Sequence, residues 1–208
     1  MMQRVRAFWR HFTYNYEQGG LYQITGKILF RIRHWGYSED RWLVYEKALG
    51  SEKLVLDAGM QWLELEADDL RRHEYFKMVQ FPEMIEHRLA QGAVCHGLLL
   101  DGRLANLGWT QLGILELDSG AVLRDKDAGG IFDCYTMPEY RGRGLYPKSI
   151  VGMMEKLQDA GAKKAMIGVD PDNVASMRGI EKAGFGSRFL LTRRRIVGRT
   201  QLLHSSSR

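Results

Sequence analysis

The chain has 208 residues, of which 45% are hydrophobic and 26% are charged, so it can form one domain with a sizeable core and an appendage. No stretch approaches the roughly 18 apolar residues of a membrane span, and the arginine-bearing N-terminus lacks the apolar core of a signal peptide. Cys95 and Cys134 lie in apolar stretches without the spacing of a metal or redox site. We therefore expect a cytoplasmic, globular protein with two reduced thiols and no metal site.

The formal net charge of +5 is unevenly distributed along the chain. Residues 1–34 carry a net +5, residues 35–181 a net −7 and residues 182–208 a net +7. Such asymmetry indicates that the two ends face an anionic partner, although basic termini also occur without one. Nucleic acid is the weakest choice of partner, because Arg193–Arg195 lies in a strand-like run and no nucleic-acid motif is present.

Residues 1–36 predict two short amphipathic helices, with apolar side chains at spacings of three and four. These apolar positions, interrupted at Gly19 and Gly20, are Val5, Phe8, Trp9, Phe12, Tyr16, Leu21, Ile24, Ile28, Ile32 and Trp35. An aromatic, basic and amphipathic helix is typical of a segment that lies on an anionic membrane surface. It is equally typical of a helix that packs on its own domain or on a second copy in a homodimer.

We favour packing for this segment, because apolar stripes usually belong to a core, and we expect its arginines to contact an anionic membrane weakly. The resulting domain prediction is a basic helical extension over residues 1–50 and a globular domain over residues 51–208.

The rest of the chain predicts strands interleaved with helices. Asp101-Gly102 between two apolar runs is a strong hairpin signal. Mixed strand pairs with interleaved helices indicate an α/β (α+β) fold. In chain order, the predicted elements are a strand or helix over 42–49, a strand over 60–66, helices over 68–75 and 83–91, strands over 92–100, 104–112 and 114–116, a polar turn region over 119–129, a strand over 131–137, a helix over 145–160, a strand over 164–169, a helix from Asn173, and strands within 185–202.

The most informative stretch is Pro-Glu-Tyr-Arg-Gly-Arg-Gly-Leu-Tyr, residues 138–146, between the strand over 131–137 and the helix over 145–160. A glycine turn at a helix start offers unpaired backbone N–H groups to an anion. Glycines lack the Cβ that would keep a phosphate at a distance, and the arginines at 141 and 143 add positive charge. The turn therefore predicts a pyrophosphate site.

A second block follows, with Asp-Pro-Asp-Asn-Val-Ala-Ser at 170–176 and Glu-Lys-Ala-Gly-Phe at 181–185. Together the blocks resemble the GNAT acetyltransferase superfamily, whose members transfer an acyl group from acyl-coenzyme A, over about residues 58–196. The resemblance implies a GNAT-like mixed sheet with helices on its faces and a splayed central strand pair, the fourth strand at 131–137 and the fifth at 164–169.

The resemblance also implies a set of cofactor-binding residues for acetyl-coenzyme A. Backbone groups of Cys134 and Thr136 would pair with the pantetheine arm like an added strand. Asn173 and Ser176 would contact the pantetheine or thioester end, although Asn173 can equally be a helix N-cap. The backbone N–H groups that would hold the pyrophosphate are those of Arg141, Gly142, Arg143, Gly144, Leu145 and Tyr146.

The catalytic residues are harder to assign. Many relatives carry a tyrosine that protonates the leaving thiolate, at the position of Ile180 here, and the helix over 173–183 has no tyrosine. The acid is therefore absent, replaced by Ser176 or water, or supplied from elsewhere. Strand alternation would place Asp133 and Tyr135 on one face, and Phe132, Cys134 and Thr136 on the other. Asp133 is the candidate base or acceptor-binding group, unless an arginine pairs with it for structural reasons.

The function that follows is an N-acyltransferase that moves an acetyl or other acyl group from acyl-coenzyme A directly to an amine of a small-molecule or carbohydrate acceptor. The alternative is a catalytically degenerate fold that acts as a coenzyme-A-binding or membrane-surface interaction protein.

Overall fold

The computed structural model describes residues 37–72, 82–117, 120–196 and 199–206. The predicted helices of residues 1–36, with their expected packing or membrane contact, lie outside these ranges. Of the described residues, 41–72, 82–117, 120–191 and 204–206 belong to one compact unit, and 37–40, 192–196 and 199–203 belong to the other. Within the described ranges, no helix has the length and apolar character needed to cross a bilayer.

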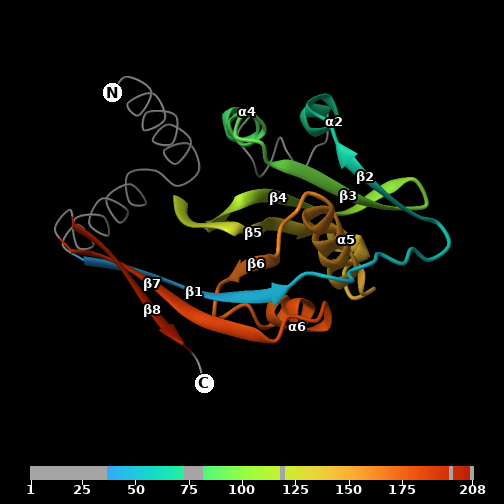
Figure 1. Cartoon of the computed structure of the whole chain (residues 1–208). Helices are drawn as coiled ribbons and strands as arrows, with labels where there is room; N and C mark the ends of the chain where they lie inside the picture. The colour runs from blue at the N-terminus through green and yellow to red at the C-terminus, as the bar shows by residue number, and fades with distance from the viewer. Residues whose placement is uncertain (1–36, 73–81, 118–119, 197–198, 207–208) are drawn as a thin grey trace, which may run out of the picture. The chain divides into compact units, whose positions relative to one another are not determined.

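The strands form an eight-stranded mixed sheet in the order β2-β3-β4-β5-β6-β1-β7-β8, and this sheet flanked by helices confirms the predicted fold class (Figure 1). The strands are β1 (Tyr37–Ala48), β2 (Met60–Leu65), β3 (Val94–Leu100), β4 (Arg103–Leu117), β5 (Ala121–Thr136), β6 (Lys164–Val169), β7 (Ser187–Ile196) and β8 (Arg199–Ser206). The described helices are α2 (Ala67–Arg72), α4 (Pro82–Ala90), the 3-10 turn η2 (Pro138–Tyr140), α5 (Leu145–Asp159) and α6 (Val174–Lys182).

Among the described residues, the two larger of three apolar clusters lie on opposite faces of the sheet in the larger unit. Leu70 of α2 and Ile85 of α4 pack in one core with side chains of β3, β4 and β5. Met153 of α5 and Ile180 of α6 pack in the other, with residues of β1, β5 and β6. Figure 1 shows α2 and α4 on one side of β3 and β4. Side chains of β5 that point to the α2/α4 face therefore have different neighbours from those that point to the α5/α6 face.

The segment over 42–49, predicted as either strand or helix, is a strand: it belongs to β1, which ends at Ala48. It pairs antiparallel with β6 from Leu43↔Val169 to Ala48↔Lys164. Part of the expected extension over residues 1–50 therefore belongs to the central sheet.

Strand β5 is longer than the sequence predicted, because residues 121–129, expected as a polar turn region, belong to it. Its first half alternates between exposed and half-buried side chains, which is the period of a strand with one solvated face. Pairs from Ile114↔Arg124 to Leu117↔Ala121 join it to β4. The prediction was wrong because polar residues of a solvated strand resemble those of a loop.

The parallel pairing of β5 with β6 is short. It runs from Ala128↔Lys164 to Ile131↔Ile167 and no further, although β6 continues to Val169 and β5 to Thr136. The two strands therefore diverge beyond Ile131, which confirms the predicted splay. Among the described strands, none pairs with this edge of β5 past the divergence.

A β-bulge interrupts β5 directly after the divergence. Leu107 pairs with Tyr135 and Trp109 with Phe132, so Asp133 and Cys134 together oppose the single residue Gly108. Asp133 accordingly has a φ of +48°, in the left-handed region.

The bulge changes which side chains share a face. Phe132 and Tyr135 both pack on the core of the α2/α4 face, and Cys134 packs on that of the α5/α6 face. The simple alternation that we predicted, with Phe132 beside Cys134 and opposite Tyr135, is therefore wrong. The extra residue shifts the alternation by one position, and the sequence of β5 alone does not reveal it.

His96 of β3 is a buried polar group beside the core. Its Nε2 atom lies 2.8 Å from the Thr110 hydroxyl, and its ring stacks on Trp62 with centroids 5.5 Å apart. Burial lowers the pKa of His96 to about 4, with a further small effect of Lys156. The folded protein therefore holds a neutral imidazole in this position.

From the lowered pKa of His96 we predict that the folded protein loses stability in mild acid. The unfolded chain protonates His96 below about pH 6.5 and the folded protein only below about pH 4, so stability falls as pH decreases through that window and levels off below it. Between about pH 7 and pH 5 the effect should be about 2 kcal/mol. Urea unfolding of wild type and His96→Gln at both pH values measures it, and equal pH dependence in the two proteins would contradict the assignment.

Candidate functional site

The glycine turn lies at the carboxyl end of β5, after η2. Gly142 and Gly144 have φ values of +78° and +72°, and Gly144 is the N-cap of α5. No side chain caps this helix, so the N–H groups of its first turn have no such partner. A Cβ built at either glycine would meet nothing within 4 Å. The backbone N–H of Arg141, predicted as a pyrophosphate donor, instead donates to the Pro138 carbonyl oxygen at 3.3 Å. The donors of the α5 first turn and the open space at the two glycines are what close approach of an anion requires.

Two arginines flank this turn and stack on tyrosine rings. The Arg141 guanidinium lies 5.5 Å from the Tyr135 ring centroid, and its Nε donates to the Thr136 carbonyl oxygen at 3.2 Å. Arg143 lies 5.4 Å from the ring centroid of Tyr140. Both arginines are exposed, so their charge is directed to the solvent beside the turn.

The structure places Cys134 and Thr136 past the divergence of β5 and β6. Cys134 is half-buried on the α5/α6 face, and burial raises the pKa of its thiol. The Thr136 hydroxyl accepts a 2.7 Å hydrogen bond from the Asn106 amide. The Thr136 carbonyl, which we expected to pair with pantetheine, accepts the bond from Arg141 here. Pairing of these two residues with a ligand remains a prediction.

Asn173 is the N-cap of α6, where its side-chain oxygen accepts a 3.0 Å hydrogen bond from the backbone N–H of Ser176. This is the capping role that the sequence allowed beside the ligand-binding one. The cap fixes the first turn of α6 and leaves the Ser176 hydroxyl to make another contact.

That contact is with Tyr146, from the first turn of α5. The Tyr146 hydroxyl and the Ser176 hydroxyl lie 2.9 Å apart, and either can be the donor. The tyrosine ring covers Gly179, where an added Cβ would collide with its Cδ1 atom. Sequence analysis assigned Tyr146 only a backbone role; a glycine inside the helical pattern over 173–183 was the signal of a close side-chain contact.

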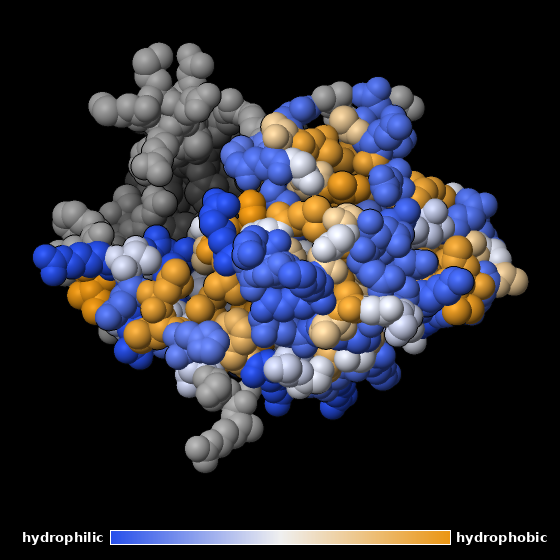
Figure 2. Space-filling view, viewed as in Figure 1, coloured by the Kyte–Doolittle hydropathy of each residue, from blue (hydrophilic) through white to orange (hydrophobic). Residues whose placement is uncertain are grey.

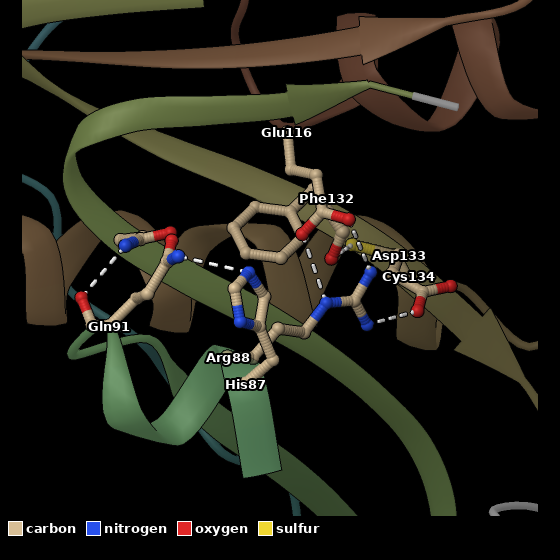
Figure 3. A network of polar contacts seen from close by, with 8 residues as sticks. His87, Arg88, Gln91, Glu116, Phe132, Asp133 and Cys134 are labelled. Carbon is tan, nitrogen blue, oxygen red and sulfur yellow. Dashed lines mark hydrogen bonds and ion pairs between the residues drawn. The ribbon is translucent and has the colours of Figure 1, made fainter. Parts of the chain in front are cut away.

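A buried ion network lies on the other face of the bulge (Figure 3). Arg88 of α4 is only 6% exposed, and its Nη1 donates to the Asp133 carboxylate at 2.6 Å. Its Nε and Nη2 donate to the two oxygens of Glu116 at 3.0 and 3.1 Å. The guanidinium also lies 5.3 Å from the Trp109 ring and 5.2 Å from the Phe132 ring.

Burial alone would lower the pKa of Arg88, but the hydrogen bonds that it donates to Glu116 and Asp133 outweigh burial and raise the pKa. The guanidinium therefore stays charged between two carboxylates whose side chains are each 31% exposed. Sequence analysis missed Arg88 and Glu116, because neither has a local pattern that distinguishes it from a solvated charge. Asp133 thus has the arginine partner that the sequence allowed as its structural alternative.

The surface around these elements mixes polar and apolar residues. The exposed apolar side chains Val55, Leu112 and Val174 come from different segments of the chain. Figure 2 shows hydrophilic and hydrophobic residues interspersed over the face in view. Single exposed apolar side chains of this kind are normal for a folded domain.

Comparison with protein families now identifies the class of the chain. The model described as the acetyltransferase (GNAT) family matches residues 58–185, which is more than half of the sequence. The chain therefore belongs to the GNAT acetyltransferase family. The matched segment contains the glycine turn, the bulge and the first turns of α5 and α6. Comparison with curated proteins finds no match.

Solved structures show the same fold. A GNAT-family protein from Novosphingobium aromaticivorans is 21% identical, with a TM-score of 0.51 over 83% of this chain and 69% of that chain. A Drosophila protein is 13% identical, with a TM-score of 0.53 over 86% of this chain and 58% of that chain. At these identities the likeness concerns the fold alone.

Proposed function

We propose that this protein transfers an acetyl or other acyl group from acyl-coenzyme A directly to an amine of a small-molecule or carbohydrate acceptor. The observation that carries the proposal is that two suitable binding features follow one another along the chain. Pairing of β5 with β6 ends at Ile131, and the same strand then runs into an uncapped glycine turn at the start of α5. A strand edge and an anion cradle therefore lie in succession along one segment of chain.

The residues present fit coenzyme A, which would supply the activated acyl thioester. The turn over 141–146 offers backbone donors, a helix N-terminus and two arginines to a pyrophosphate. The edge of β5 beyond Ile131 offers backbone N–H and C=O groups to the amides of pantetheine, as an added strand would. Asn173 and Ser176 begin α6, which packs against α5 on the same face, and would contact the thioester end.

The ion network supports an amine as the acceptor. The carboxylates of Asp133 and Glu116 hold Arg88 between them, and their side chains are each 31% exposed. Partly exposed carboxylates accept hydrogen bonds from a cationic amine and orient it. Because Arg88 already holds the Asp133 carboxylate at 2.6 Å, we assign Asp133 to acceptor binding and not to the role of general base.

The alternative function, a degenerate fold that binds coenzyme A without turnover, has one observation in its favour. The helix α6 carries Ile180 where many relatives have a tyrosine. The two functions differ in turnover with amine acceptors and agree in coenzyme A binding, so both measurements are needed.

Gly144→Glu tests coenzyme A binding at the glycine turn. A glutamate there places a carboxylate where a phosphate would bind, so affinity for coenzyme A should fall about tenfold or more. Isothermal calorimetry measures the affinity. Gly161→Glu is the matched control, because Gly161 also has a positive φ and open space around it, beyond the other end of α5. Equal affinities for the two variants would sink the proposed pyrophosphate site.

Asp133→Asn tests the proposed binding of the amine acceptor by Asp133. Asparagine tolerates the positive φ and keeps an oxygen for Arg88 but loses the charge, so kcat/KM for the amine should fall about 10- to 100-fold, mainly through KM. Coenzyme A affinity should stay the same. Asp101→Asn is the control, because Asp101 has a φ of +51° in the β3–β4 turn. A fall in kcat with unchanged KM would instead make Asp133 the base, and unchanged kinetics would remove it from the site.

A further inference from the structure

Tyr146 connects the two helices that flank the divergence of β5 and β6. It lies in the first turn of α5, two residues after the glycine N-cap, and its hydroxyl reaches the Ser176 hydroxyl in the first turn of α6. The two hydroxyls come from segments 30 residues apart in sequence. A side chain that begins at the glycine turn therefore ends at the start of α6.

The sequence of α6 makes room for this side chain. The ring of Tyr146 packs on the backbone at Gly179, and any larger residue at that position would collide with it. A glycine inside a helix costs about 1 kcal/mol relative to alanine, so its presence in α6 needs a compensating contact. The lack of a side chain at Gly179 of α6 thus leaves space for the phenol ring of Tyr146 from α5.

The phenol lies near the bulge of β5. Tyr146 and Cys134 pack against the same core on the α5/α6 face, together with Met177 of α6. The Tyr146 ring therefore packs on the α5/α6 face, the same face to which the bulge directs Cys134.

We propose that the Tyr146 hydroxyl donates a hydrogen bond to the sulfur that leaves during acyl transfer, and that Ser176 holds the phenol in position. This inference rests on the proposed function and names the residue that acts on its leaving group. The donor comes from α5, in place of the tyrosine that α6 lacks.

The chemical step balances without a further reactant. The bond between the amine nitrogen and the acyl carbon forms while the carbon–sulfur bond breaks, and its electron pair stays on sulfur. The phenol stabilises that charge as a fixed donor stabilises an oxyanion. The cationic amine first loses one proton to water and attacks as the neutral form. The nitrogen loses a second proton as the new bond forms and the sulfur gains one on release as a thiol, so Tyr146 ends the cycle with its own proton.

The surroundings keep the phenol in the form that this role requires. Burial raises the pKa of Tyr146, and the nearby Cys134 thiol raises it further, whereas the bond with Ser176 opposes the shift. The hydroxyl therefore retains its proton at neutral pH. The Ser176 hydroxyl can accept that proton in a hydrogen bond while the site is empty and donate to the phenol oxygen when a sulfur arrives.

The test compares wild type with Tyr146→Phe and Ser176→Ala. The first readout is the pKa of the thiol of bound coenzyme A, followed by ultraviolet absorbance of the complex with the protein-alone titration subtracted. Loss of a hydrogen bond to the thiolate should raise this pKa by about one unit or more in Tyr146→Phe. The second readout is kcat, which should fall about 10²-fold in Tyr146→Phe and about tenfold in Ser176→Ala.

Tyr45→Phe is the matched control, because the Tyr45 hydroxyl is also hydrogen-bonded, to Glu181 and Arg188, and lies outside the proposed site. It should leave both readouts at wild-type values. If Tyr146→Phe does not fold, Gly179→Ala decides instead, because its Cβ would displace the Tyr146 ring and leave the Ser176 hydroxyl in place.

Wild-type values of thiol pKa and kcat in Tyr146→Phe, or in Gly179→Ala where that variant decides, would overturn the inference while leaving the proposed function intact. Absence of coenzyme A binding to the wild-type protein in calorimetry would overturn both.

Discussion

The site depends on one feature of the sheet, the end of parallel pairing between β5 and β6 at Ile131 and Ile167. A strand edge inside a domain leaves backbone N–H and C=O groups that need partners. Here that edge is followed by the glycine turn at the start of α5, while α6 follows β6 on the same face. If the two strands paired along their full length, the edge would be filled and the proposed pantetheine path would close.

The bulge at Asp133 directs neighbouring side chains of β5 to the two opposite faces of the sheet. One extra residue sends Asp133 to Arg88 of α4, while Cys134 packs on the core of α5 and α6. The acceptor and the acyl donor are thereby assigned to opposite sides of one strand. The ion network on one face and the tyrosine–serine pair on the other can be altered independently, which makes the two roles separable by mutation.

Sequence reasoning succeeded where the backbone itself demands a residue type. The positive φ angles at Gly142 and Gly144 and the cap at Asn173 leave local signatures, and the family resemblance supplied the splay. It failed where distant segments meet. The bulge depends on Gly108, whose Cβ would lie 2.9 Å from the Cys134 sulfur, and neither that contact nor the pairing of Arg88 is encoded in a short pattern.

A crystal structure of the protein with acetyl-coenzyme A tests the central claim most directly. The account predicts pyrophosphate oxygens about 3 Å from backbone nitrogens of the turn over 141–146, pantetheine along the edge of β5 beyond Ile131, and the thioester sulfur beside the Tyr146 hydroxyl. A coenzyme bound away from the glycine turn, or β5 and β6 paired beyond Ile131 in the complex, would contradict it.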